Sequence, residues 1–329
     1  MPAPQARFRY TLGAGGMSVF LVLVLILTGI LEMFYYVPAP DKAAQSVQEI
    51  TFLVPYGSII RGLHYWAAQL LVGVAIIHLL RVILTGGYAQ ARRFNYLLGI
   101  ILFVVLIFLD FSGYILRWDE GIRWALVAGT NLIRTIPLIG NSLYRFVMGG
   151  NQPGAATLIR FYAWHIFGLT LVLVGVGVWH LFRVRRDGGI SVPPPAMRAD
   201  QARISRDELV RREVLAAILA SALLIVITLA FPAPIAAPMD LSSTAASDSR
   251  APWFFLWVQH MLRWGDPFLF GILIPLGTLV ALALIPYILP EPLPGELGGW
   301  FPRHARSAQL VAATIAIILV VLTILGLVT

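Results

Sequence analysis

Cysteine is absent from this chain of 329 residues, and charged residues make up only 12% of it. Without a thiol there is no disulfide, no thiolate nucleophile, no cysteine-bound iron–sulfur cluster and no thioether attachment of haem. The scarcity of charge, with a mean hydropathy of +0.82, excludes an ordinary soluble domain. The formal net charge of +8 does not indicate nucleic-acid binding, because no soluble segment is long enough for a domain that reads a groove. Lipid is therefore the expected solvent.

Seven stretches are long and apolar enough to cross a bilayer, whose hydrocarbon core of about 30 Å needs about 20 helical residues. They cover about 17–37, 63–84, 96–116, 162–182, 214–232, 268–289 and 308–328. The first follows Arg7 and Arg9 as in a signal peptide, but no small-residue cleavage site ends it, so we expect a retained span. The sequence predicts an all-α polytopic membrane protein.

Three parts are expected along the chain: a four-helix domain over 1–190, a cytoplasmic linker over 191–213, and a three-helix domain over 214–329. Pro193, Pro194 and Pro195 mark the linker. The long connection between the third and fourth spans is rich in Trp, Leu and Ile, which indicates short amphipathic helices on the outer surface. The connection before the sixth span carries an aromatic cluster and is expected to fold back onto the membrane.

Arginines indicate the orientation of the spans. Most arginines outside the spans fall in the N-terminal segment and in the segments 81–93, 183–212 and 303–306. These segments share one side of the membrane, and the positive-inside rule makes that side cytoplasmic. The N-terminus is then cytoplasmic and the C-terminus lies outside. The segment 183–212 is expected to rest against anionic lipid heads.

Four of the six histidines lie in two spans, His64 and His78 in the second and His165 and His180 in the fourth. Separations of 14 and 15 residues advance a helix by about 21–22 Å and return nearly to the same face. Both spans cross in the same direction, so His64 faces His165 near the outer surface and His78 faces His180 near the inner one. Such pairs at two depths suit the irons of two b-type haems.

Other readings of the histidines exist. A single histidine in an apolar helix is more often a hydrogen-bonded core residue or a proton relay. Copper or zinc would usually want ligands clustered at one depth. Four histidines in matched register favour two haems over both alternatives.

Glycines in the two flanking spans repeat the spacing. Gly15 and Gly29 in the first span, and Gly99 and Gly113 in the third, are each 14 residues apart. A porphyrin that lies edge-on between helices needs places where no side chain projects, and we expect these glycines to provide them. The alternative is that glycine is simply common in membrane helices.

Several blocks of sequence carry a family resemblance. They are Arg61-Gly-Leu-His64-Tyr-Trp66, His78-Leu-Leu-Arg81 with Thr85-Gly-Gly87, Gly113-Tyr-Ile-Leu-Arg-Trp-Asp119, Ile136-Pro-Leu-Ile-Gly140 and Arg160-Phe-Tyr-Ala-Trp-His165. In this order they resemble the cytochrome b family of the bc and bf-type quinol-oxidising complexes. The likeness covers nearly the whole chain. Four helices followed by three resembles a bf-type cytochrome b joined to its separate smaller subunit.

The resemblance implies cofactors and partners as well as a fold. Arg61, Arg81 and Arg185 would lie near haem propionates or an inner quinone site; the alternative for Arg185 is interfacial anchoring. The outer quinol site would include Pro252, Trp253 and Phe254. Quinol would be the substrate. A Rieske-type iron–sulfur protein, a cytochrome c-type subunit and a second copy of the complex would be partners in an energy-transducing membrane, the cytoplasmic membrane of a prokaryote.

Three departures from the family matter. Gly13 stands where the bf type has the cysteine of an extra haem, so no covalent haem c is expected. Arg117 replaces a proline. Ala251-Pro-Trp-Phe254 replaces the Pro-Glu-Trp-Tyr motif, so the glutamate thought to accept a quinol proton is missing.

Asp110 is the candidate to replace that glutamate. It is an ionisable residue within an apolar span, three residues before Gly113, and is therefore expected near the outer haem. The alternative is a carboxylate paired with an arginine such as Arg117. His260 and Asp248 are weaker candidates, each more typical of a solvated loop.

The sequence thus favours a dihaem cytochrome b subunit of a quinol:cytochrome c (or equivalent acceptor) oxidoreductase, which moves electrons between outer and inner quinone sites. The missing glutamate supports a first alternative, a dihaem conduit between the quinone pool and another redox enzyme. A second alternative is a haem-free membrane scaffold with the same fold.

Overall fold

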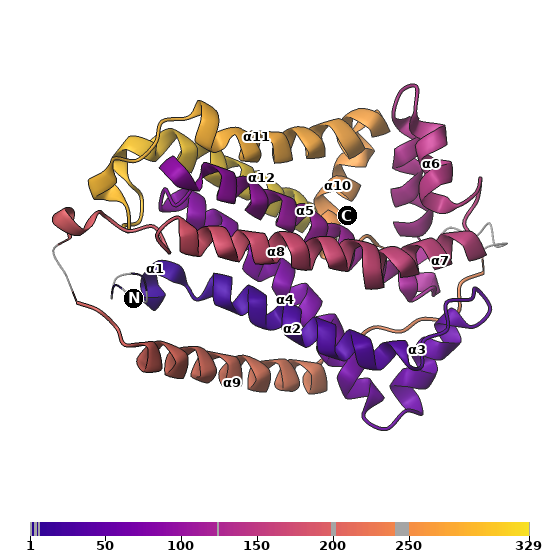
Figure 1. Ribbon diagram of the computed structural model, residues 1–329. Coiled ribbons are helices and arrows are strands. Elements are labelled where there is room, and N and C mark those ends of the chain that lie inside the picture. The colour runs from indigo at the N-terminus through magenta and orange to yellow at the C-terminus, as the bar shows by residue number, and fades with distance from the viewer. Residues whose placement is uncertain are drawn as a thin grey trace.

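The computed structural model describes residues 2, 5, 7–123, 125–198, 202–240 and 250–328, and its regular structure in these ranges is helical (Figure 1). Seven helices in this part of the chain are long and apolar enough to cross a membrane. The predicted all-α polytopic membrane fold is therefore confirmed, and the chain is a multi-pass membrane protein.

The spanning helices are longer than the predicted stretches at several ends. They are α2 (Ala14–Met33), α4 (Gly57–Leu84), α5 (Arg93–Leu116), α7 (Ala155–Ala163) continuing into α8 (Leu169–Arg186), α9 (Arg206–Ala230), α11 (Ile274–Ile288) and α12 (Arg306–Val328). Shorter helices are α1 (Phe8–Thr11), α3 (Ala43–Phe52), α6 (Gly140–Met148) and α10 (Leu256–Met261). A π-helical turn at Trp164–Gly168 joins α7 to α8, and another at Leu269–Leu273 precedes α11.

Two helix pairs form the core of the N-terminal part. Helix α2 packs along α4 and α5 packs along α8, and α4 also contacts α5. Buried residues from three of these helices, among them Leu21, Leu71 and Leu106, form one cluster with Leu224 of α9. Apolar side chains such as Leu215 and Ile218 on the outer side of α9 are more than half exposed. Such a surface is stable only in contact with lipid.

The bundle has two ends, which we name the α1 end and the α3 end (Figure 1). Helix α1 and the connection from α8 to α9 lie at the α1 end. Helices α3 and α6 and the segment that follows α9 lie at the α3 end. Helix α9 begins at Arg206, inside the segment 191–213 that the sequence predicts as a linker, and the Ser205 side chain caps it by accepting from the Glu208 amide at 3.2 Å. The charged first turns of this helix hide its start from an apolar-run criterion.

The segment after α9 is fastened across the α3 end by two buried side chains. Arg61 of α4 donates to the carbonyls of Ala233 (3.2 Å) and Pro234 (2.5 Å). Asp119 accepts from the Ala236 amide at 3.1 Å and forms an ion pair of 2.7 Å with Arg117. These contacts connect the segment after α9 to α4 and to the residues that follow α5.

Replacing Asp119 by alanine is expected to lower the free energy of unfolding by about 3–5 kcal/mol, because Arg117 is left as a buried charge without its partner. Side-chain exposures of 12% for Arg117 and 4% for Asp119 show that water does not compensate the loss. Thermal unfolding of the protein in detergent measures the effect. The control is Glu208→Ala, which breaks the exposed pair with Arg212 and should cost no more than about 1 kcal/mol. Equal effects of the two substitutions would contradict the structural role of Asp119.

Candidate functional site

The four histidines lie on α4 and on the helix formed by η6 and α8, as two pairs at different depths. The ring centres of His64 and His165 are 6.3 Å apart, with an interplanar angle of 70°. A metal–imidazole nitrogen bond is about 2 Å long, so two such bonds together with two ring radii of about 1 Å span roughly 6 Å. The separation of this pair therefore fits one metal ion bound between two imidazoles.

Hydrogen bonds fix the orientation of three of the four rings. Nδ1 of His165 lies 3.1 Å from the carbonyl oxygen of Leu109, and Nδ1 of His180 lies 3.1 Å from that of Asn95. Nδ1 of His64 lies 2.9 Å from the hydroxyl oxygen of Thr28, which itself donates to the Val24 carbonyl. An Nδ1–H that donates to an oxygen leaves the lone pair of Nε2 free for a metal. Nδ1 of His78 is buried without a partner in the described part of the chain.

The four glycines singled out in the sequence each lie against one histidine. A Cβ atom at Gly113 would lie 2.7 Å from Cε1 of His165, and one at Gly29 would lie 3.1 Å from Cε1 of His64. The corresponding distance is 3.5 Å for Gly15 with His78 and for Gly99 with His180. The sequence predicts a porphyrin edge at these positions, and the structure places an imidazole there. The missing side chains let each ring pack against the backbone of the neighbouring helix.

His165 occupies an unusual stretch of backbone. It lies in the π-helical turn Trp164–Gly168, and its carbonyl accepts a hydrogen bond of 2.5 Å from the Thr170 hydroxyl. Such turns insert one residue into a helix and change the direction of the side chains on either side. This turn is one reason why spacings of 14 and 15 residues can both match a single partner helix.

The histidine pairs suit haem better than a bare metal ion. The described residues contain no group of three or more His, Cys, Asp or Glu side chains that could hold a metal. A protein zinc site uses three or four protein ligands, whereas each pair here supplies two. A macrocycle that provides the remaining ligands makes two imidazoles sufficient.

The three arginines expected near the haems have different surroundings. Arg81, one turn after His78, donates to the Tyr10 carbonyl at 3.0 Å and lies over the Tyr10 ring at 4.3 Å, while its buried second terminal nitrogen has no partner among the described residues. That nitrogen can bind a carboxylate. Arg61 is occupied by the carbonyls described above. Arg185 is exposed in the last turn of α8.

A chain of hydrogen bonds connects Asp110 to the expected quinol site. The side-chain nitrogen of Gln69 lies 3.3 Å and 3.4 Å from the two Asp110 oxygens, and its oxygen accepts from the indole nitrogen of Trp253 at 2.8 Å. The alternative partner, Arg117, instead pairs with Asp119. Gln69 is a residue that sequence reasoning missed, because a single glutamine in an apolar span has no periodic signal.

The other candidates at this end of the bundle are distributed as follows. Trp253 is 39% exposed, whereas its neighbour Phe254 is buried in the cluster that contains Leu224. Pro252 precedes them at the start of the same turn. His260 packs edge-on against Trp264, with ring centres 5.6 Å apart. Asp248 lies outside the described residues.

Comparisons with known proteins bear on this arrangement. Residues 2–188 match the family model described as cytochrome b/b6/petB. The chain belongs to the cytochrome b family. Cytochrome b6 of Heliobacterium modesticaldum is 35% identical over 187 residues, which are 57% of this chain and 88% of that protein. The cytochrome b subunit of the menaquinol:cytochrome c reductase of Geobacillus thermodenitrificans is 36% identical over 175 residues, 53% of this chain and 78% of that protein.

A solved structure extends the likeness of fold beyond the family match. A chain of a hyperthermophilic respiratory Complex III superposes with a TM-score of 0.76 and covers 97% of this chain and 92% of its own length, at 19% sequence identity. Helices α9, α11 and α12 therefore belong to the shared fold. Membership of the cytochrome b family implies b-type haem, which the paired histidines fit.

Proposed function

We propose that this chain is the dihaem cytochrome b subunit of a quinol:cytochrome c, or equivalent acceptor, oxidoreductase. The single observation that carries the proposal is the His64–His165 pair, whose ring centres are 6.3 Å apart and whose Nδ1 atoms both have oxygen partners. His64 and His165 would hold one haem, and His78 and His180 the other. When bound, the two haems supply one-electron transfer between the two faces of the membrane. Neither haem would be covalently attached.

The residues around each pair would hold and shield the group. Thr28 and the carbonyls of Leu109 and Asn95 keep three Nε2 atoms directed at the metal position. Gly15, Gly29, Gly99 and Gly113 let the rings approach the flanking helices. Arg81, with its free buried nitrogen, would neutralise a propionate on the inner haem. Arg61 would do the same at the outer haem only by sharing its existing carbonyl contacts, and Arg185 would act at the inner surface.

Quinol oxidation at the outer surface releases two protons, so a group there must accept them. We assign this role to Asp110, which the Gln69 side chain connects to Trp253. Pro252 and Trp253 would contact the quinol head directly. Phe254 would support them from the core, where it is buried. This arrangement stands in for the missing glutamate.

Replacing Asp110 by asparagine is expected to slow quinol oxidation by about a hundredfold or more, the usual contribution of a general base, with both haems retained. Steady-state quinol oxidation and the reduced-minus-oxidised spectrum are measured together. The matched control is Asp266→Asn, because Asp266 is exposed and only caps the Leu269 amide. Normal turnover in the Asp110 variant would remove this residue from the mechanism.

Orientation, domains and partners follow from the same proposal. The α1 end would face the cytoplasm and the α3 end the outside, in the cytoplasmic membrane of a prokaryote. Residues 1–190 would be the haem-binding part and 214–329 the part that completes the outer quinol site. A Rieske-type iron–sulfur protein and a cytochrome c-type subunit would accept electrons at the α3 end, within a homodimeric complex in contact with membrane lipid.

One observation favours a second candidate function. Ala251 stands before Pro252, so the usual carboxylate is missing from the turn that carries Trp253. A dihaem conduit that joins the quinone pool to another redox enzyme needs no proton acceptor there. Inhibitors of the outer quinol site distinguish the two functions, since they block turnover only if quinol is oxidised at that site.

A further inference from the structure

A cavity of about 390 Å³ lies between α2, α3 and α4 at the α3 end of the bundle. Its nine lining residues comprise one carboxylate, two aromatic rings and six aliphatic or glycine residues. They are Leu31, Glu32, Phe34, Tyr35, Ile50, Val54, Pro55, Gly57 and Ile60. The volume is in the range of small-molecule sites, about 300–1,000 Å³. None of these residues belongs to the Asp110–Gln69–Trp253 chain.

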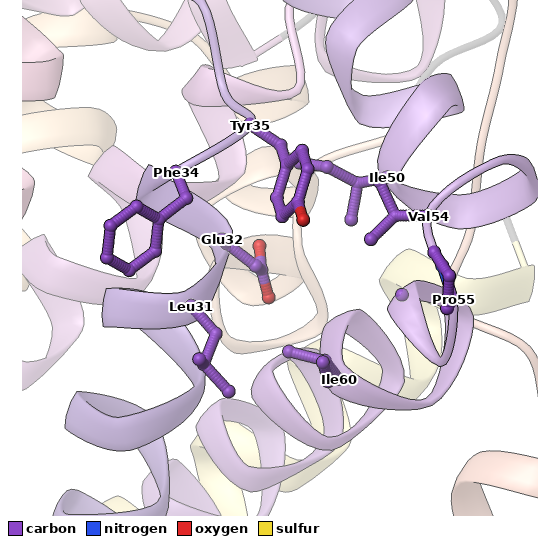
Figure 2. Close-up of a pocket in the computed structure, with 9 residues that line it drawn as sticks. Leu31, Glu32, Phe34, Tyr35, Ile50, Val54, Pro55 and Ile60 are labelled. Carbon is purple, nitrogen blue, oxygen red and sulfur yellow. The ribbon is translucent and has the colours of Figure 1, made fainter.

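Glu32 is the polar group of this cavity. Its carboxylate points into the space between Tyr35 and Ile60 (Figure 2). One carboxylate oxygen, Oε1, is buried and has no hydrogen-bond partner in the described part of the chain. A buried acceptor without a donor is unfavourable, and a ligand that brings a donor relieves it. The site therefore selects a molecule with a hydroxyl or ammonium group.

The lining restricts that molecule further. Phospholipid heads carry a phosphate, which needs cations or several donors, and the lining described above offers a single carboxylate and one tyrosine hydroxyl. A neutral aromatic head with a hydroxyl group fits better, because the aromatic and aliphatic walls can cover its ring. Phe34, Tyr35 and Tyr56 around the opening are more than half exposed, so the approach from lipid is apolar as well.

The cavity is close to the outer histidine pair along the chain. Glu32 follows Gly29, which lies against His64, by three residues, or about 4.5 Å along a helix. The cavity is therefore at the same membrane face as the proposed site of quinol oxidation, but on the side of α2 and α3 rather than of Trp253.

We propose that this cavity is a second outer-leaflet binding site for the quinol head, in which the Glu32 carboxylate accepts a hydrogen bond from a quinol hydroxyl. The inference rests on quinol being the substrate. It adds a binding site separate from the one assigned to Pro252 and Trp253, and no chemical step occurs there.

Photolabelling of the intact complex in its membrane tests the proposal. The probes are a benzoquinol and a naphthoquinol, each with a short alkyl tail and a diazirine on the ring side, and labelled peptides are identified by mass spectrometry. Label is expected on residues 31–36 and 50–60 as well as on 251–259. Glu32→Leu should reduce the first label about tenfold or more, the usual effect of losing a hydrogen bond to a charged group. Ile60→Trp, which fills the cavity, should have the same effect without changing the carboxylate.

Two controls separate this site from the one at Trp253. Glu49→Gln changes an exposed carboxylate of α3 that is bonded to Gln45, and it should leave both labels unchanged. Trp253→Ala should reduce the label on 251–259 and keep the label on 31–36 and 50–60. That pattern supports the second site.

Three other outcomes overturn the inference. Label on 251–259 alone leaves the proposed function in place and rejects the second site. Label at neither position rejects both. Label on 31–60 that persists in Glu32→Leu and Ile60→Trp, or that an ethanolamine phospholipid displaces better than unlabelled quinol does, shows that the cavity does not recognise the quinol head.

Discussion

Replacing His165 by leucine is expected to remove one of the two haems and to reduce quinol oxidation to background. Leucine fills the space of the ring but has no nitrogen for the iron. The partner His64 would remain with a single metal bond, which is too few to hold a six-coordinate b-type haem. The hydrogen bonds from Nδ1 of His165 to Leu109 and Ser112 would also be lost. Haem content per chain and the reduced-minus-oxidised spectrum measure the result.

The matched control is His304→Leu. His304 is an exposed histidine whose Nδ1 lies 2.9 Å from a Glu296 oxygen, so its loss should leave the haem content and the spectrum unchanged. His180→Leu is expected to remove the other haem and keep the one at His64. Full haem content in the His165 variant would show that this residue is not an iron ligand.

Alanine substitutions at the glycines are expected to form a graded series. At Gly113 the new Cβ would lie 2.7 Å from the His165 ring, a distance that forces the ring or the helix to move. Overpacking of this kind costs about 1–3 kcal/mol, which corresponds to roughly a tenfold or greater loss of haem retention. At Gly29 the distance is 3.1 Å and the effect should be smaller.

The other positions supply the controls for that series. Gly15→Ala and Gly99→Ala place the Cβ at 3.5 Å from a ring, an ordinary contact, and should retain their haem. Gly73 lies on α4 between the two histidines, and its Cβ would meet nothing within 4 Å. Haem dissociation rates, measured by transfer to an apoprotein acceptor, should follow the order Gly113, Gly29, then the remaining three. Equal rates at Gly113 and Gly73 would contradict the close packing of the glycines against the rings.

Periodic features of the sequence predict the fold well. Apolar runs identify all seven spans, because the length of a span is set by the thickness of the bilayer and can be counted. The spacing of 14 and 15 residues between histidines depends only on helix geometry, and this geometry alone pairs His64 with His165. The positions of the four glycines can be found in the same way.

Features that depend on contacts between distant segments are not visible in the sequence. The segment that includes Ala233 and Pro234 binds Arg61 through backbone carbonyls, which have no sequence signature. Gln69 acquires its role only because α4 brings it between Asp110 and Trp253. Glu32 is easily overlooked because it follows an apolar run at the position where a polar residue is expected at a membrane surface. The start of α9 at Arg206 escapes prediction because charged residues form its first turns.

The central claim is that two pairs of imidazoles each bind an iron porphyrin. It is tested most directly by the haem content of the purified, intact complex, combined with near-infrared magnetic circular dichroism, which identifies the axial ligands. Two non-covalent haems per chain, both with bis-imidazole ligation, are expected. A haem-free chain, or irons with any other axial ligand, would contradict the claim and leave only the membrane-spanning fold of the cytochrome b family.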